Sequence, residues 1–170
     1  MTSIDDLPYF GHITEVKVFD EGGEGVVYRL STTPSTPFPL CAKVMGLSMY
    51  RSENDRLFRL ENEARVNQSL YEAGISVPRP VGLFRLLSPV HSSPVPGFVR
   101  ECIEGRTYYQ LFSWQKEKAV KVFEEERQKA IELDFIPEDC YPTKNCLYTV
   151  KGWSVERVTL FDFSFWRKRK

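Results

Sequence analysis

The chain lacks any long hydrophobic run, since no stretch of its 170 residues approaches the roughly 20 consecutive apolar residues that a transmembrane helix needs. It also carries no net charge, because 23 lysines and arginines balance 23 aspartates and glutamates. Its first residues, 1–6, are acidic and lack the basic-then-apolar order of a signal peptide. We therefore expect an intracellular, cytoplasmic protein for which neither a membrane nor a nucleic acid is the main partner.

Histidine is scarce, and the four cysteines form no C-x-x-C pair. Cys41 and Cys102 lie within apolar runs, as small core residues do, and both histidines are far in sequence from Cys140 and Cys146. We expect free thiols in a reducing compartment and no zinc site. The one basic run, Arg167-Lys168-Arg169-Lys170, we interpret as a frayed tail, with a nuclear-import or nucleic-acid patch as the alternative.

The apolar content of 42%, with 14% aromatic residues, is enough to bury a core. Two segments rich in Ser, Thr and Pro, 31–37 and 88–97, are predicted to be loops between strands. Short runs rich in Val, Phe, Leu or Ile predict strands at about 12–19, 26–31, 38–45, 81–87 and 97–103. Two final strands, at about 146–150 and 157–162, are predicted to form a hairpin around residues 151–153.

Two helices are predicted between these strands. The first begins with a capping-box pattern at Ser52 and Asp55 and ends at Gly74, which can adopt the left-handed stop conformation. Its expected buried face comprises Leu57, Leu60, Ala64 and Tyr71. The second covers about 114–133, with Val120, Phe123, Ala130 and Leu133 on its apolar side. Strands and helices do not alternate strictly, so the sequence predicts an α+β fold.

Two features of the N-terminal half point to an anionic ligand. The glycines within Asp20-Glu21-Gly22-Gly23-Glu24-Gly25 would let backbone N–H groups approach phosphates closely, although a glycine-rich hairpin turn is the alternative. Lys43 stands in the middle of an apolar strand, where a lysine is rarely buried without a partner. An edge-strand lysine facing water is the alternative for Lys43.

Residues 20–29 resemble the glycine-rich loop of protein kinases, G-x-G-x-x-G-x-V-Y, with Asp20 in place of the first glycine. The resemblance implies that the loop contacts the nucleotide through Gly22, Gly23, Gly25 and Val27. It also implies that Lys43 neutralises the first two phosphates of ATP and pairs with a helix glutamate.

The glutamate that the resemblance favours is Glu63, with Glu61 as the competitor. Glu63-Ala64 followed by Gly74-Ile75-Ser76-Val77-Pro78 resembles the E-A…G-x-x-V-P run of RIO-type and lipopolysaccharide-core kinases.

Residues 97–105 resemble the strand and hinge of the same families. This resemblance implies adenine contacts at Glu101 and Ile103. Arg100 falls at the position that usually gates the back pocket, from which it could also reach toward Glu63 or solvent.

Two motifs of the C-terminal third resemble the catalytic motifs of these families. Asp162-Phe163-Ser164 resembles D-F-G, and residues 139–147 resemble the catalytic loop H-x-D-x-x-P-x-N-x-L, with Pro137 in the histidine's place and Asn145 one residue late. The resemblance implies that Asp139 is the catalytic base and that Asn145 and Asp162 bind Mg²⁺ or Mn²⁺. Asp134 is a rival for the aspartate role, and Asp139 could also be an ordinary turn residue.

Together the motifs predict a protein-kinase-like fold: a five-stranded antiparallel N-lobe with one helix (residues 1–103), a hinge, and a vestigial C-lobe (residues 104–170) that ends shortly after the D-F-G-like motif. The expected activity is transfer of the γ-phosphate of ATP to a serine or threonine hydroxyl of a protein. A pseudokinase that binds nucleotide or a partner without turnover is the alternative, and a small-molecule kinase is the weaker one.

Aromatic residues near the C-terminus predict a surface for the protein substrate or partner. With a shortened C-lobe, we expect Trp153, Phe163, Phe165 and Trp166 to form an exposed docking face. The alternative is that these rings pack onto the helix at 114–133 and complete a small core.

Overall fold

The computed structural model describes residues 4–10, 13–21, 25–32, 35–45, 52–87 and 93–169. The fold is α+β with antiparallel sheets, as predicted. The chain forms two compact units, one made of Met1–Ala64 and Pro80–Cys102, the other of Arg65–Arg79 and Ile103–Lys170. The linear order of the motifs does not reveal that Arg65–Arg79 groups with the C-terminal residues.

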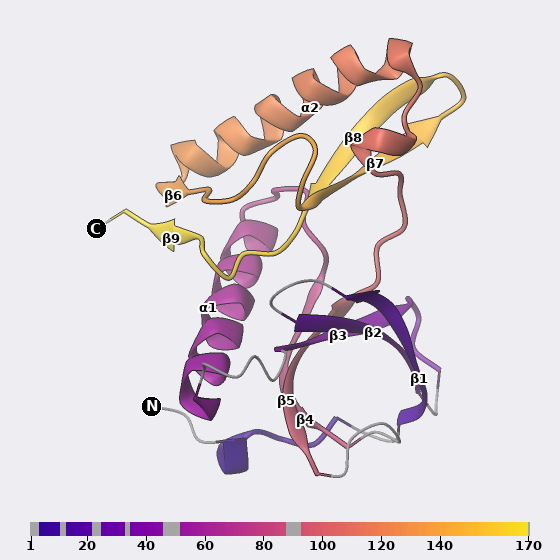
Figure 1. Cartoon of the computed structure of the whole chain (residues 1–170). Coiled ribbons are helices and arrows are strands. Elements are labelled where there is room, and N and C mark those ends of the chain that lie inside the picture. Colours follow the sequence, from indigo (N-terminus) through magenta and orange to yellow (C-terminus); the bar gives the residue numbers. More distant parts are fainter. Residues whose placement is uncertain are drawn as a thin grey trace. The chain divides into compact units, whose positions relative to one another are not determined.

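The first unit is built on a five-stranded antiparallel sheet with the order β1-β2-β3-β5-β4. Its strands are β1 (Ile13–Glu21), β2 (Gly25–Thr32), β3 (Leu40–Met45), β4 (Pro80–Leu86) and β5 (Val95–Glu101), and their bounds differ from the predicted ones by two residues at most. Figure 1 shows that this sheet curves strongly. Every residue of β3 is buried, because β3 is the middle strand.

Before the sheet, a short 3-10 helix, η1 (Ile4–Asp6), leads into a segment that pairs with β4 through a parallel bridge between Tyr9 and Arg85.

The helix α1 (Glu53–Glu72) begins and ends where the sequence predicts. The Ser52 hydroxyl accepts a hydrogen bond from the Asp55 N–H, and the Asp55 carboxylate accepts one from the Ser52 N–H, which completes a capping box. Gly74 follows with φ of 79°, a left-handed conformation that glycine adopts without strain. In the first unit, a small apolar cluster joins this helix to the sheet: Met45, Leu60 and Phe98, with Ala64 and Leu83 beside them.

The second unit contains η2 (Tyr108–Gln110), the helix α2 (Ser113–Glu132) and four strands in two antiparallel pairs. One pair is β7 (Cys146–Lys151) with β8 (Ser154–Leu160), which is the predicted hairpin and turns at Gly152 with φ of 58°. The other pair is β6 (Phe135–Ile136) with β9 (Arg167–Lys168). The prediction that the basic run is a frayed tail is therefore wrong for Arg167 and Lys168, which form a strand.

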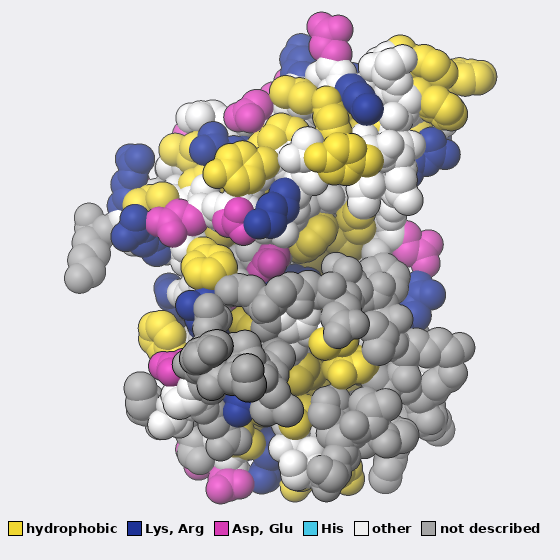
Figure 2. Space-filling view, viewed as in Figure 1, with side chains coloured by type: hydrophobic (Ala, Val, Ile, Leu, Met, Phe, Trp, Pro, Cys, Tyr) yellow, Lys and Arg dark blue, Asp and Glu magenta, His cyan; other side chains and the backbone are white. Residues whose placement is uncertain are grey.

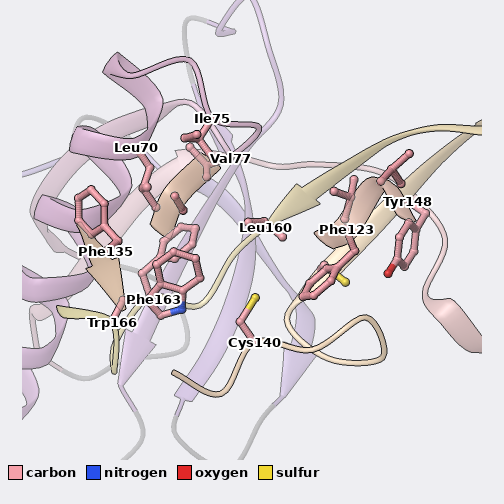
Figure 3. Packing of buried hydrophobic residues seen from close by; sticks show 14 of the residues in the cluster. Leu70, Ile75, Val77, Phe123, Phe135, Cys140, Tyr148, Leu160, Phe163 and Trp166 are labelled. Atoms are coloured by element: carbon pink, nitrogen blue, oxygen red, sulfur yellow. The ribbon is translucent and has the colours of Figure 1, made fainter. Parts of the chain in front are cut away.

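The core of the second unit gathers residues from the end of α1, from α2 and from the β7–β8 hairpin (Figure 3). Its buried aromatic residues are Phe123, Phe135, Tyr148, Phe163 and Trp166. The rings of Phe163 and Trp166 meet edge to face, with centroids 5.0 Å apart. Trp166 is 1% exposed and Phe163 is fully buried, so the prediction that they lie on an exposed face is wrong.

Three predicted core positions on the helices are also wrong. Tyr71 of α1 is 41% exposed, and Val66 and Leu70 are buried instead. Val120 of α2 and Leu133, the residue that follows this helix, are more than one third exposed. The buried side of α2 contains Gln115, Ala119, Val122, Phe123, Glu126 and Ala130. The predicted face of α2 is rotated from the observed one because only apolar residues define it, whereas the polar residues Gln115 and Glu126 are buried and form hydrogen bonds.

No helix in the described ranges is long and apolar enough to cross a membrane.

Candidate functional site

A buried cluster of three charged residues connects α1 to the middle of the five-stranded sheet. Lys43 Nζ lies 2.8 Å from Glu63 Oε2, and Arg100 Nη1 lies 3.3 Å from Glu63 Oε1. Lys43 is 4% exposed, Arg100 is 5% exposed, and Glu63 is fully buried. Charges at this depth strongly favour staying paired, because an uncompensated buried charge is costly.

The strand order and the pairing decide between the alternatives that the sequence left open for Lys43 and its partner. Lys43 belongs to β3, which lies between β2 and β5, so the alternative that it is an edge-strand lysine facing water is wrong. Of the two candidate glutamates, Glu63 is the one that pairs with Lys43, while Glu61 is partly exposed.

Gly22, Gly23 and Glu24 of the glycine-rich segment lie outside the described residues. Gly25 opens β2 and pairs with Met45, and a Cβ atom at Gly25 would lie 2.5 Å from the carbonyl oxygen of Val44. Glycine is therefore required here by the close approach of β2 and β3, whatever ligand binds. Val27, two residues on, is the pairing partner of Lys43.

At the predicted hinge, Glu101 is the last residue of β5 and pairs with Leu40. Its carbonyl oxygen accepts a hydrogen bond from the Cys41 thiol at 3.7 Å. A hydrogen bond with Cys102, together with burial, raises the pKa of the Cys41 thiol, so this thiol stays protonated. Ile103, the other predicted adenine contact, is half-buried and belongs to the second unit.

In the second unit, the four acidic or amide residues that the sequence singles out all have left-handed backbones. The φ angles are 64° at Asp134, 54° at Asp139, 60° at Asn145 and 63° at Asp162. Asp and Asn tolerate this region better than other residues with a Cβ atom, but it remains uncommon. Such conformations occur at helix ends and in turns, and they also concentrate at functional sites.

The conformation of Asp134 has a structural cause. Asp134 lies two residues after the end of α2. Its N–H donates to the Ile131 carbonyl at 3.0 Å, and its own carbonyl accepts from the Arg169 N–H at 2.7 Å. It therefore terminates the helix in the way a left-handed residue commonly does. This leaves Asp139 as the better candidate for the catalytic aspartate.

The loop from Asp139 to Asn145 is held by side-chain and backbone hydrogen bonds. Asn145 Nδ2 donates to the Asp139 carbonyl at 2.8 Å, and the Tyr148 hydroxyl donates to the Pro142 carbonyl at 2.7 Å. Lys144 Nζ forms an ion pair with Asp139 Oδ2 at 2.5 Å, and both side chains are substantially exposed. Asp139 is thus an exposed carboxylate in a well-braced loop.

Asp162 lies beside this loop. It follows β8 by two residues, and the Phe161 N–H next to it donates to the Asn145 carbonyl at 3.0 Å. The hydrogen bond that Lys144 donates to the Asp139 carboxylate raises the pKa of Lys144, and the negative charge of Asp162 adds to this effect. The structure therefore brings Asp139, Asn145 and Asp162 into one neighbourhood.

Ser164, which stands where D-F-G has glycine, interacts directly with Asp162. Its hydroxyl donates to Asp162 Oδ1 at 2.8 Å, and its side chain is buried. The serine thus orients the carboxylate that the resemblance assigns to metal binding.

The oxygen donors of Asp162 and Asn145 suit a hard cation such as Mg²⁺, which commonly takes one or two protein oxygens and completes its shell with phosphates and water. The described part of the chain contains no cluster of three or more His, Cys, Asp or Glu side chains that could hold a metal by itself. These residues therefore fit a metal that arrives with a phosphate ligand better than a permanent metal centre.

Sequence reasoning missed two residues of this region. Glu126 of α2 accepts hydrogen bonds from the Ser76 N–H and from Lys129 Nζ, and it anchors the turn after α1. Glu126 lies between Phe123 and Ala130 on the same side of α2, and this spacing in the sequence would have predicted that Glu126 is buried. Lys144 was missed because a lysine in a loop has no pattern that predicts an ion pair.

No family model and no curated protein matches this chain.

Proposed function

We propose that this chain is a minimal protein-kinase-like enzyme that binds ATP with Mg²⁺ or Mn²⁺ and transfers the γ-phosphate to a protein hydroxyl. The observation that carries the proposal is the buried ion pair of Lys43 with Glu63, which joins the middle strand of a sheet to a helix. The ion pair with Glu63 fixes the position of the Lys43 ammonium. A positive charge in a fixed position can neutralise the phosphates of a bound nucleotide.

In the proposed fold, the first unit is the N-lobe and the second is a reduced C-lobe. The antiparallel sheet with α1 supports the first assignment. The assignment of the second unit as the C-lobe is supported by three features that follow one another along the chain: the turn at Asp139, the hairpin β7–β8 and the segment at Asp162.

The proposed roles of the first-unit residues concern binding. Lys43 contacts the phosphates and Glu63 keeps its ammonium in place, while Gly25 and Val27 lie on the strand that follows the glycine-rich segment. The backbone at Glu101 and Ile103 is assigned to the adenine.

The proposed roles of the second-unit residues concern transfer. A bound divalent ion would neutralise charge on the phosphates, with Asp162 and Asn145 as its protein ligands. Asp139 accepts the proton of the substrate hydroxyl as its oxygen bonds to the γ-phosphorus and the bond from this phosphorus to the bridging oxygen of ADP breaks. Lys144 forms an ion pair with Asp139 and holds the side chain of this aspartate in the loop.

The direct test is nucleotide binding followed by transfer. Mg·ATP at 100 times its Kd should stabilise the folded chain by about 2.7 kcal/mol and raise the melting temperature. Lys43→Ala should weaken that shift, and Glu61→Ala should leave it unchanged. Absence of any shift at millimolar ATP, with Mg²⁺ and with Mn²⁺, would contradict the proposal.

A pseudokinase is the second candidate, and one observation favours it. The carboxylate proposed as the base is already engaged by Lys144, and Pro137 stands where kinases have a histidine. Radiolabelled ATP separates the two functions, since the enzyme transfers label to itself, to generic substrates or to a lysate protein. Tight Mg·ATP binding without any transfer would support the pseudokinase.

A further inference from the structure

Arg100 shares the Glu63 carboxylate with Lys43. One carboxylate oxygen, Oε2, contacts Lys43 and the other, Oε1, contacts Arg100. A carboxylate engaged through both oxygens has a fixed rotation as well as a fixed position.

The strand register places both cations on the same face of the sheet. Lys43 pairs with Phe98, and Cys41 pairs with Arg100, so Lys43 and Arg100 are diagonal neighbours across β3 and β5. Residues two apart on a strand share a face, and the Arg100 guanidinium accordingly lies 5.8 Å from the centroid of the Phe98 ring.

The surroundings of this cluster make its geometry rigid. Leu60 and Ala64 flank Glu63 on the helix, and they pack with Met45 and Phe98 of the sheet. Water has little access, because Lys43, Glu63 and Arg100 are all at least 95% buried. Moving α1 away from the sheet would break two buried ion pairs together.

We propose that Arg100 is a positioning residue that holds Glu63 where it orients Lys43, so that the Lys43–Glu63 pair is preformed and is not made and broken by movement of α1. This inference rests on the proposed function, in which Lys43 binds the phosphates of ATP. Arg100 touches neither the nucleotide nor the reacting atoms in this proposal, and its effect reaches ATP through Glu63 and Lys43.

The test is a double-mutant cycle on Mg·ATP binding. Dissociation constants are measured by calorimetry for the unmodified chain, Arg100→Met, Lys43→Met and the double variant. We expect Arg100→Met alone to weaken binding by about tenfold, within the usual range of coupling between sites. In the Lys43→Met background it should add less than about twofold, because the group through which it acts is already gone.

Three controls make the result specific. Arg100→Lys keeps the charge and should recover most of the lost affinity. Arg85→Met removes another arginine of the same sheet, whose ion pair with Asp5 is on the surface, and should leave the Kd unchanged. Circular dichroism and melting of each variant check the fold, and Arg100→Gln replaces Arg100→Met if the latter does not fold.

The possible outcomes separate the two claims. If Arg100→Met weakens binding by the same factor with and without Lys43, or if Arg85→Met has the same effect, Arg100 supports only the fold and the inference is wrong. If the unmodified chain does not bind Mg·ATP at all, the proposed function is wrong and this inference falls with it.

Discussion

At the scale of single residues, Glu63 is the carboxylate on which the buried charge of the first unit depends. It compensates two cations, Lys43 and Arg100, in a region from which water is nearly excluded. Replacing one partner of such a cluster is costly because the other charges stay buried. Replacing Glu63 should therefore lower the stability of the chain even when no nucleotide is present.

We predict that Glu63→Ala lowers the free energy of unfolding by about 3–5 kcal/mol. The matched control is Glu61→Ala, two residues away on the same helix and partly exposed, which should change it by less than about 0.5 kcal/mol. Urea denaturation of both variants measures the difference. Equal small effects would contradict the assignment of Glu63 as the buried partner.

Asp139 and Asp134 give a second contrast at this scale, since both are left-handed aspartates near the end of α2. We predict that Asp139→Asn lowers phosphoryl transfer by about 100-fold or more while Mg·ATP binding changes little. Asp134→Asn should leave both unchanged, because its left-handed backbone terminates α2 and Asn tolerates that conformation. Radiolabel transfer and calorimetry measure the two quantities; a reversed order would make Asp134 the functional aspartate.

At the scale of elements, two buried thiols lie close together in sequence: Cys140 in the loop before β7, and Cys146 at the first position of β7. Burial raises the pKa of Cys146 to about 11 and that of Cys140 to about 12, from an ordinary value of 9.0. The folded chain therefore keeps both protons at pH values where the unfolded chain loses them. This difference links the stability of the second unit to pH.

We predict that the free energy of unfolding falls as pH rises from about 9 toward 11. Each thiol should contribute at most about 1.4 kcal/mol per pH unit, because the unfolded state binds fewer protons in this window. Below pH 9 the contribution is fully present and constant. Urea denaturation at pH 8, 9 and 10 measures the slope, and the Cys140→Ala/Cys146→Ala variant should show a flatter one. Identical slopes would mean that other groups cause the loss.

At the scale of the whole chain, the large aromatic residues of the second unit divide into buried core residues and exposed surface residues. Trp166 is buried in the core of the second unit, whereas Trp153, in the turn between β7 and β8, is 79% exposed. Near Trp153 lie two further exposed rings, Trp114 and Phe112, which stack at a centroid distance of 4.6 Å. Figure 2 shows hydrophobic side chains at the far end of this hairpin. A docking surface for a protein substrate stays a prediction, now centred on Trp153.

We predict that Trp166→Ala lowers the free energy of unfolding by about 3–5 kcal/mol, since it empties a core position. Trp153→Ala should change it by less than about 0.5 kcal/mol, because the side chain is on the surface. Thermal and urea unfolding compare the two variants. If Trp153→Ala proved as destabilising as Trp166→Ala, Trp153 would belong to the core and the docking prediction would fail.

Much of the local structure follows from patterns within short segments. The capping box at Ser52 and the left-handed glycine at Gly74 set the two ends of α1, and short runs rich in Val, Phe, Leu or Ile predict the strands. A buried partner for Lys43 was predictable, since a lysine in an apolar strand requires one, and the resemblance to kinases implied that this partner is Glu63. The buried side of α2 was not predictable from apolar residues alone, because Glu126 is buried by its hydrogen bond to the Ser76 backbone.

The sequence by itself thus determined the α+β class, the order of the two long helices and of the longer strands, and the residues eligible for a site, because these depend on local propensity and on spacing along the chain. Only the tertiary structure decided which ion pairs form: Arg100 pairs with Glu63, as Lys43 does, and Lys144 pairs with Asp139. It also decided that Trp166 is buried and that Trp153 is exposed. The physical reason is the same in each case. Ion pairs and the burial of single side chains depend on which distant segments pack together, and the periodicity of one segment does not say which other segment it contacts.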